Sequence, residues 1–391
     1  MQVLTADRVF TPDLRPGVAS VRIVDGIVAG LDEAASDGLR LPPGWFVTPG
    51  LVQMHVHGGG GFDMTSGRPD ALSAALRWHL ARGATTTVVS LITAPLEHLE
   101  RTLGVIAGVV ESDTDHTLPD VLGSHLEGPF LSAERRGVHD PRLLLPPDRH
   151  LLRRLVSAAR GTLRMVTLAP ELNGALAAVD ELLHEGIVVA LGHTDAPTAT
   201  VRDAVRRGAS VATHLFNGMR PLHHRDPGPV GVLLDEPTVI CEVIGDDMHL
   251  DPVVTRLAVQ AAGSDRIALV TDAVAATGGP DGEYSLGTGR SVRLGGVLRS
   301  AAGSSLAGGT ESLAGLLSRA VRRGTPLTDA VRSLTIVPAR ALQVSDRAGR
   351  IVTGRPADLC VFDADCNLQG VMRRGRWARY WSTELGGVKL S

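Results

Sequence analysis

The chain has 391 residues, of which 43% are hydrophobic and 21% are charged, and its formal net charge at pH 7 is −3. This length is enough for one large α/β barrel with an accessory domain, and the composition is that of an ordinary globular protein. The sequence contains no basic block, so we expect neither nucleic acid nor a membrane surface as a partner.

Two further observations concern the cellular location. No apolar run approaches the roughly 18 residues of a membrane-spanning helix, and the first residues, MQVLTADRVFTPDLRPG, lack the basic and then apolar pattern of a signal peptide. The chain has three cysteines, and their spacing is not that of a zinc site. We expect them to be small buried residues in a cytoplasmic protein.

The two ends of the chain have the pattern of short strands and turns. Residues 1–48 include VLTADRVF and VASVRIVDGIVAGL, and residues 345–391 have the same character. Neither end could close a core alone, so we predict that they pair into one small β-sandwich domain that is discontinuous in sequence. Residues 49–344 are then left for a second domain, which we expect to be catalytic.

From about Gly50 onward, β-rich runs alternate with segments whose apolar residues are three and four apart, such as LEHLERTLGVIAGVVES. Eight such β-rich runs alternating with helices predict a (β/α)8 TIM-type barrel. A doubly wound open sheet is the main alternative, but the chain lacks a convincing glycine fingerprint of a dinucleotide site. After the eighth strand, residues 280–305 are expected to form a β-hairpin before the last barrel helix, at 310–324. The strand candidates are GLVQMHVH, ATTTVVSLIT, VLGSHLEGPF, RMVTLAPE, IVVALGHTD, SVATHLFN, VICEVIGDDMH and RIALVTDA.

The first barrel strand leads into two histidines, His55 and His57, in PGLVQMHVHGGGGFD. Side chains two residues apart in a strand point to the same face, so both rings would point the same way. Taken alone, the pair could bind a metal or could be two hydrogen-bonded polar residues. The glycines that follow would let backbone or substrate approach closely.

Polar residues also end the other strand candidates. In a barrel, all of these residues would lie at the carboxyl-terminal mouth, where barrel enzymes place their chemistry. Histidine and carboxylate are ligands that suit zinc and other divalent transition metals, so together they favour a metal site. The residues concerned are Thr93, Glu127, Glu171, His193, His214, Asn217, His249 and Asp272.

Five of the strand-end residues could hold one or two metal ions, and Glu127 could bridge a pair. A metal lowers the pKa of its bound water towards about 7, so metal-bound hydroxide is the expected nucleophile. Asp272 suits a general acid/base that takes the proton of the attacking water and passes it to the leaving group. Its alternative role is a helix N-cap. The predicted ligands are His55, His57, Glu127, His193 and His214.

These motifs resemble those of the amidohydrolase superfamily and, within it, those of the N-acetylglucosamine-6-phosphate deacetylases. The matching stretches run in family order from Pro49 to Gly309, and GRIVTGRPADLCVFD resembles the family's closing β segment. The resemblance therefore covers essentially the whole chain. The most specific stretches are HLEGPF and THLFNGMRPLHHR.

The resemblance implies roles for individual residues. Glu127, His193 and His214 match the family's metal ligands, Asp272 its general acid/base, and His249 a histidine that polarises the acetamide carbonyl. Arg225 matches an arginine that reaches a phosphate in the neighbouring subunit, which implies a homodimer. The implied cofactor is zinc or iron, one or two ions per subunit. The residues implied in substrate binding are His139, Asn217, Gly218, His224, Arg225 and His249.

The expected reaction is hydrolysis of the acetamide of N-acetyl-D-glucosamine 6-phosphate to D-glucosamine 6-phosphate and acetate. The galactosamine analogue differs at one hydroxyl and is the first alternative. The non-enzyme alternative is a barrel that binds a sugar phosphate without catalysis. The presence of all expected ligands and of Asp272 argues against it. Amidohydrolases with a lysine bridge fit less well, because Lys389 is the only lysine of the chain.

Overall fold

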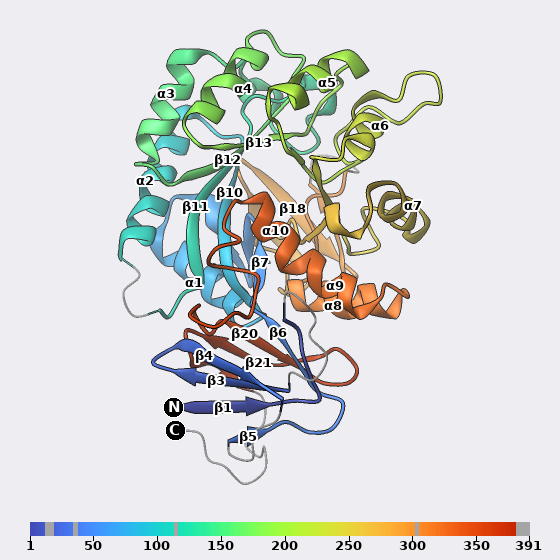
Figure 1. Cartoon of the computed structure of the whole chain (residues 1–391). Helices are drawn as coiled ribbons and strands as arrows, with labels where there is room; N and C mark the ends of the chain where they lie inside the picture. The colour runs from blue at the N-terminus through green and yellow to red at the C-terminus, as the bar shows by residue number, and fades with distance from the viewer. Residues whose placement is uncertain (12–18, 34–37, 113–115, 302–304, 381–391) are drawn as a thin grey trace.

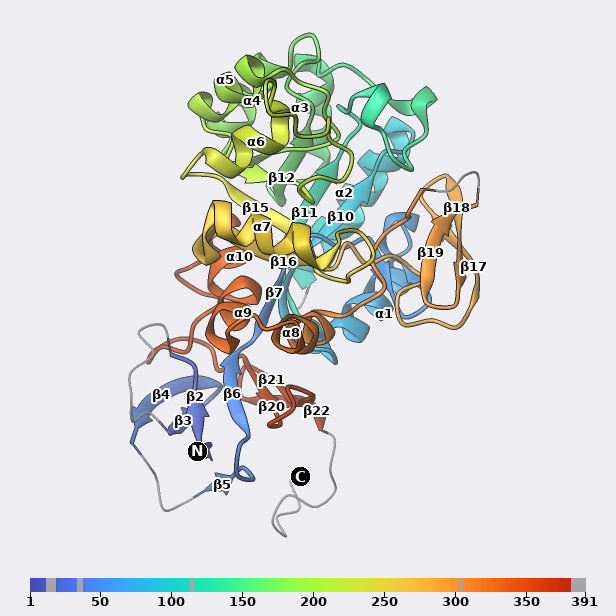
Figure 2. The same cartoon turned by 90° about the vertical axis from the view of Figure 1, so that its right-hand side faces the viewer.

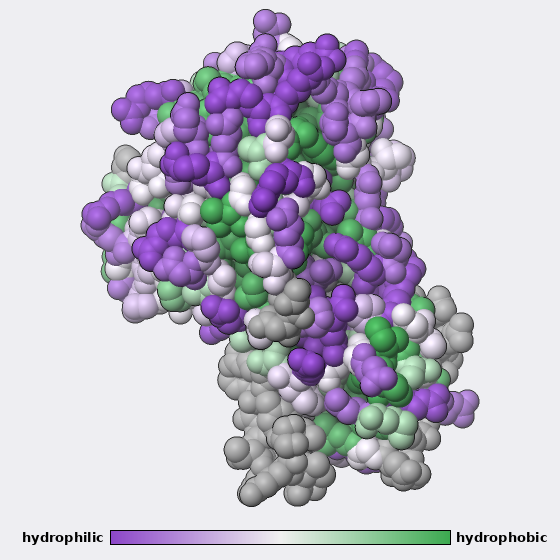
Figure 3. Space-filling model, turned by 90° about the vertical axis from the view of Figure 1, so that its left-hand side faces the viewer, coloured by the Kyte–Doolittle hydropathy of each residue, from purple (hydrophilic) through white to green (hydrophobic). Residues whose placement is uncertain are grey.

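The computed structural model describes residues 1–11, 19–33, 38–112, 116–301 and 305–380 (Figure 1). Lys389 and the last eleven residues of the predicted carboxyl-terminal flank lie outside these described residues. No helix in the described ranges is long and apolar enough to cross a membrane. On the face drawn in Figure 3, hydrophilic residues cover most of the upper part, with hydrophobic residues between them, and further hydrophobic residues show on the lower part.

The centre of the molecule is a parallel sheet of eight strands in the order β16-β15-β14-β13-β12-β11-β10-β7. The two edge strands approach each other just past their ends, where Val56 and Ala273 form a parallel bridge and the N–H of His57 donates to the carbonyl of Ala273 at 2.7 Å. The sheet therefore closes into a barrel. Its strands are β7 (Leu51–Gln53), β10 (Ala84–Ile92), β11 (Asp120–Glu127), β12 (Leu163–Leu168), β13 (Val188–Leu191), β14 (Val211–Ala212), β15 (Ile240–Ile244) and β16 (Ile267–Val270).

Helices surround the barrel, as Figures 1 and 2 show. In α2 the buried residues include Leu99, Leu103 and Ile106, spaced three or four apart, so that one stripe of the helix packs on the strands. The helices are α1 (Pro69–Leu80), α2 (Leu96–Ser112), α3 (Arg149–Ala158), α4 (Ala175–His184), α5 (Thr198–Arg207), α6 (Gly228–Asp235), α7 (Pro252–Ala262), α8 (Leu313–Arg322), α9 (Leu327–Leu334) and α10 (Ile336–Ala341).

Alternate residues of the barrel strands pack in two different cores. On β10, Val88 belongs to the cluster inside the barrel, whereas Val89 belongs to the larger cluster between strands and helices. Both are fully buried. Because both faces of the strands are covered, their sequences show no regular alternation of buried apolar and exposed polar residues.

Both ends of the chain build the two small sheets beside the barrel. The first has the order β4-β3-β1-β5 and the second the order β2-β6-β20-β21-β22, in which β6 from the amino-terminal part pairs antiparallel with β20 from the carboxyl-terminal part. Residues of both sheets, such as Val21 and Leu359, share one apolar cluster. The strands are β1 (Gln2–Thr5), β2 (Arg8–Val9), β3 (Ser20–Val24), β4 (Ile27–Asp32), β5 (Leu39–Arg40), β6 (Phe46–Pro49), β20 (Leu359–Phe362), β21 (Leu368–Arg373) and β22 (Arg376–Tyr380).

This architecture confirms the predicted (β/α)8 barrel with a small β sandwich built from both chain ends. The domain boundaries at 48/49 and 344/345 stay a prediction. One detail of the prediction was incomplete, because the segment after the eighth strand contains three antiparallel strands where a single hairpin was expected. These are β17 (Gly282–Leu286), β18 (Gly289–Leu294) and β19 (Val297–Ser300), which stand at the side of the barrel in Figure 2.

The glycines after His57 serve close packing of their own loop. A Cβ atom on Gly59 would lie 2.7 Å from Nε2 of His79, and one on Gly60 would lie 2.2 Å from the ring of Trp78. The loop, which contains β8 (Gly58–Gly59) and β9 (Phe62–Asp63), therefore rests on the side chains of α1. This close approach is what the run of glycines makes possible.

His79 in this contact gives a testable dependence of stability on pH. It is 1% exposed, its Nε2–H donates to the carbonyl of Gly58 at 2.9 Å, and burial lowers its pKa from 6.5 to about 4. The unfolded chain therefore takes up a proton below pH 6.5 that the folded chain refuses until about pH 4. We expect His79 to favour folding fully above pH 6.5 and to lose about 3 kcal/mol of that contribution as the pH falls towards 4.

The measurement is the free energy of unfolding in urea from pH 7.5 to pH 4, for the wild type and for His79→Gln, whose amide still donates but does not titrate. Other histidines titrate in both proteins, so only the difference between the two curves reports on His79. That difference should change in favour of the variant as the pH falls. A difference that is constant over the range would show that the pKa of His79 is not lowered.

Candidate active site

The predicted site residues meet at the carboxyl-terminal mouth of the barrel. Most of them line a cavity of about 290 Å³, bordered also by Leu286 of the three-stranded sheet. Three of them do not line this cavity. His55 is fully buried behind it, and His224 and Arg225 lie exposed on the loop between Met219 and α6. The predicted site residues that line it are His57, Glu127, His139, His193, His214, Asn217, Gly218, His249 and Asp272.

Three of these residues leave their strands through an unusual backbone conformation. The φ angles of His193, His214 and Asp272 are 46°, 27° and 46°, in the left-handed region that residues with a side chain seldom adopt. Each such residue costs on the order of 1–3 kcal/mol, and such residues cluster at functional sites. The abrupt turn at these strand ends brings the three side chains to the cavity.

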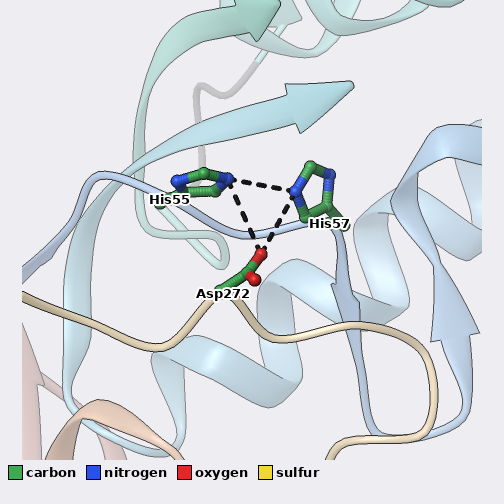
Figure 4. A group of neighbouring side chains, drawn as sticks. All are labelled: His55, His57 and Asp272. Atoms are coloured by element: carbon green, nitrogen blue, oxygen red, sulfur yellow. Dashed lines mark hydrogen bonds and ion pairs between the residues drawn. The ribbon is translucent and has the colours of Figure 1, made fainter. Parts of the chain in front are cut away.

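The side chains form two groups. In the first, Nε2 of His55 lies 3.1 Å from Nε2 of His57, and Oδ1 of Asp272 lies 3.6 Å and 3.3 Å from these two atoms (Figure 4). In the second, Oε1 of Glu127 lies 2.8 Å from Nε2 of His214 and 3.1 Å from Nε2 of His193. The ligand atoms of Glu127, His193 and His139 also lie within 4.8 Å of one another, so His139 borders this second group.

Glu127 lies between the two groups. Its Oε2 atom is 3.2 Å from Nε2 of His57, and its Oε1 atom is 3.6 Å from Nε2 of His55. One carboxylate therefore touches histidines of both groups. Glu127 is therefore placed where its carboxylate could bind an ion held by either group.

The outer nitrogen of each of the four histidines is held by an oxygen. Nδ1 of His57 donates to the carbonyl of Ser90 at 3.1 Å, that of His193 to the carbonyl of Arg135 at 2.7 Å, and that of His214 to the carbonyl of Asn217 at 3.2 Å. Nδ1 of His55 lies 2.9 Å from Oε2 of Glu242. A proton on each Nδ1 leaves the lone pair of each Nε2 facing the centre.

The centre is therefore made of acceptors alone, four imidazole lone pairs and the carboxylates of Glu127 and Asp272. Such a set is repulsive unless cations lie among the ligand atoms. Imidazole nitrogen and carboxylate oxygen are the donors that zinc and other divalent transition metals take, and ligating histidines commonly donate their other N–H to an oxygen. The residues thus fit one or two divalent transition metal ions.

Without a metal ion, protons supply the positive charge. Burial would lower the pKa of His57, but hydrogen bonds with Asp272 and Glu127 raise it to about 9. Burial would raise the pKa of Asp272 and of Glu127, but hydrogen bonds and the charges of the neighbouring histidines lower that of Asp272 to about 2 and hold that of Glu127 well below its usual value. Both carboxylates are therefore ionised at neutral pH.

The remaining cavity residues differ in how they are held. Burial lowers the pKa of His139 to about 4, and its Nδ1 atom is 2.8 Å from the hydroxyl of Thr93. A Cβ atom on Gly218 would lie 2.7 Å from Nδ1 of His193, so only glycine lets the chain pass this close to the ring. His249 lies five residues beyond the end of β15, and its Nδ1 atom is 2.9 Å from Oδ2 of Asp246, which leaves Nε2 for a ligand.

The site contains two buried carboxylates that the sequence-based prediction did not include. Glu242 is fully buried on β15, and Asp246 is 3% exposed in the loop that follows. The signal for Glu242 is an acidic residue within the apolar run VICEVI, because a carboxylate in a buried strand needs a partner. For Asp246 the signal is weaker, since acidic residues in loops are common.

Comparison with known proteins agrees with the fold and the site. The model of the amidohydrolase family matches residues 46–378. The chain belongs to the amidohydrolase family. This confirms the resemblance seen in the sequence, and members of this family generally use a divalent metal.

Individual amidohydrolases resemble the chain over almost all of its length. An N-acetylgalactosamine-6-phosphate deacetylase of Escherichia coli O157:H7 is 34% identical over 97% of this chain and 99% of its own. An N-acetylglucosamine-6-phosphate deacetylase of Vibrio furnissii is 33% identical over 95% of this chain and 90% of its own. The structure of a variant N-acetyl-D-glucosamine-6-phosphate deacetylase of Mycobacterium smegmatis, in complex with N-acetyl-D-glucosamine-6-phosphate, covers 96% of this chain and 99% of its own, with 39% identity and a TM-score of 0.89.

Proposed function

We propose that the protein is a metal-dependent deacetylase that hydrolyses the acetamide of N-acetyl-D-glucosamine 6-phosphate to D-glucosamine 6-phosphate and acetate. The observation that carries the proposal is the all-acceptor centre of histidines and carboxylates, in one cavity with Asp272, His249 and Asn217. The relatives that cover nearly the whole chain and are named deacetylases of amino-sugar phosphates support the choice of substrate.

The ligands of the proposed metal centre are His55, His57, Glu127, His193 and His214, with zinc or iron as the metal and one or two ions per subunit. A divalent ion bound there would act as a Lewis acid on the acetamide carbonyl and would lower the pKa of water near it. Asp272 borders the ligand atoms and stays ionised at neutral pH, so it can accept a proton.

Asp272 takes the proton of the attacking water on its carboxylate and then gives it to the amine nitrogen as the carbon–nitrogen bond breaks. With a proton on both ring nitrogens, His249 donates from Nε2 to the carbonyl oxygen, where negative charge develops, while Asp246 accepts its Nδ1–H. The pair Asp246 and His249 is thus a proposed oxyanion donor with its orientation fixed.

The remaining cavity residues bind the sugar phosphate in this proposal. His139, Asn217 and Gly218 border the reaction centre within the same cavity. His224 and Arg225 lie on an exposed loop. His224 is proposed to bind the substrate, and the proposed role of Arg225 is to reach the phosphate bound by a neighbouring subunit in a homodimer. A guanidinium suits that role because it can hold two phosphate oxygens at once.

A cytoplasmic location is part of the proposal. The three cysteines are buried and form no disulfide, which is compatible with a reducing compartment. They are Cys241, Cys360 and Cys366. The galacto epimer is a second candidate substrate, which the similarity to the Escherichia coli relative favours.

The test is acetate release by the purified protein with N-acetylglucosamine 6-phosphate and with its galacto epimer, before and after chelation and metal add-back. We expect turnover of the gluco compound that is lost on chelation and restored by zinc or iron. Faster turnover of the galacto compound would replace the substrate and keep the reaction. Acetate from neither compound, in protein with bound metal, would contradict the proposed function.

A further inference from the structure

Glu242 is a carboxylate at the centre of the barrel that the predicted ligand set does not include. Its side chain is 0% exposed on β15. β15 pairs with β16, and Asp272 follows the end of β16 by two residues. A buried carboxylate is unfavourable unless hydrogen-bond donors compensate for the lost water. The donors that compensate for it here belong to the metal centre.

A single oxygen of Glu242 holds both of its contacts. Oε2 is 2.9 Å from Nδ1 of His55, and it also accepts the backbone N–H of His214 at 3.0 Å. His55 belongs to the first ligand group and His214 to the second. One carboxylate oxygen thus contacts a member of each group from outside the centre.

Glu242 differs from the other oxygens that hold the outer nitrogens of the histidines. Those of His57, His193 and His214 are held by backbone carbonyls, which no substitution removes. Only His55, among the four, depends on a side chain for this contact. The contact with Glu242 keeps the proton on Nδ1 and turns Nε2 towards His57 at 3.1 Å and Asp272 at 3.6 Å.

The second contact acts on the backbone. The N–H that Glu242 accepts belongs to His214, whose φ of 27° is an unfavourable backbone conformation. The contact therefore helps to hold His214 in that conformation. This contact holds the backbone of His214 in place, and the hydrogen bond from Nδ1 to the carbonyl of Asn217 sets the orientation of its ring.

We propose that Glu242 is a positioning residue that pre-organises the metal centre through the side chain of His55 and the backbone of His214. This inference rests on the proposed metal-dependent function. Removal of a comparable partner of a metal ligand typically lowers metal affinity about 10–100-fold. Because Glu242 holds the ring of His55 directly, we expect the group of His55, His57 and Asp272 to lose its ion first.

The test is zinc titration of the metal-free protein against a competing chromophoric chelator, with no substrate present. Glu242→Met, unbranched and of similar length, removes both contacts. It should lower the zinc affinity of the group of His55, His57 and Asp272 about 10–100-fold. Glu242→Gln can place its amide oxygen where Oε2 lies and should stay within about tenfold of the wild type. Thr87→Val, which changes a buried polar residue of β10, is the matched control and should bind zinc as the wild type does.

A double-mutant cycle with His55→Gln separates positioning from a general structural role. The loss caused by Glu242→Met should shrink at least severalfold in the His55→Gln background, because the ring that Glu242 orients is gone. Wild-type zinc affinity in Glu242→Met, or an undiminished loss in the double variant, would overturn the inference. Since zinc binding is measured without substrate, absence of acetate release would count against the proposed function alone.

Discussion

Replacement of Asp272 by asparagine is expected to lower kcat by about 10²–10⁴-fold, the range that a general acid/base supplies. Asparagine has the same shape and keeps one oxygen towards His55 and His57, but it cannot take up the proton of the attacking water. Metal content should therefore stay at the wild-type value. The measurement is the rate of acetate release at saturating substrate, together with the metal content of the same preparation.

The matched control for this variant is Asp148→Asn, which makes the same chemical change at the N-cap of α3, outside the cavity. Its kcat should equal that of the wild type. If Asp272→Asn kept wild-type turnover with metal bound, the proton-transfer role of Asp272 would be wrong. If the variant lost its metal as well, Asp272 would be a necessary ligand, and its effect on kcat could not be assigned to proton transfer.

The features of the site that the sequence predicts are those with a side-chain signal at a strand end. His193 in LGHTD and Asp272 in LVTDA each lie two residues past an apolar run, so a barrel fold alone brings them to one mouth. His249 is five residues past its strand, and its place in the cavity depends on a loop fixed by Asp246. Strand periodicity cannot predict such a position.

The orientation of the ligands is the part that the sequence leaves open. Three of the four histidine rings are held by the carbonyls of Ser90, Arg135 and Asn217, and any residue type supplies a carbonyl. Glu242 is the exception, since an acidic residue within the apolar run VICEVI can be recognised from the sequence. Loop geometry decides which carbonyl faces which ring, and no local pattern encodes that.

The barrel itself was predictable because its strands and helices have different apolar periods. The pairing of β6 with β20 was predictable only by exclusion, since neither end of the chain could bury its own strands. The third strand of the segment after β16 was not expected from the sequence. The boundaries between the barrel and the small sheets stay predictions, because β6 continues almost directly into β7.

The second large effect is expected from Glu127→Gln. The carboxylate of Glu127 touches His193 and His214 through Oε1 and His57 through Oε2, so it contacts histidines of both groups. An amide removes the charge and turns an N–H₂ donor towards a ring nitrogen or the metal. The loss of metal affinity should exceed the roughly 10–100-fold that follows removal of an outer partner, and acetate release should fall below detection.

Glu171→Gln is the control that makes this prediction specific. Glu171 also follows a barrel strand, but its carboxylate accepts the hydroxyl of Thr194 and the N–H of Asp195, both at 2.6 Å, and lies outside the ligand groups. Its variant should keep its metal and its turnover. A Glu127→Gln protein with the wild-type metal content would show that the two groups bind independently and that no bridge is needed. Loss of metal in Glu127→Gln, with the metal content of Glu171→Gln unchanged, is the result expected if Glu127 is a ligand of the metal centre.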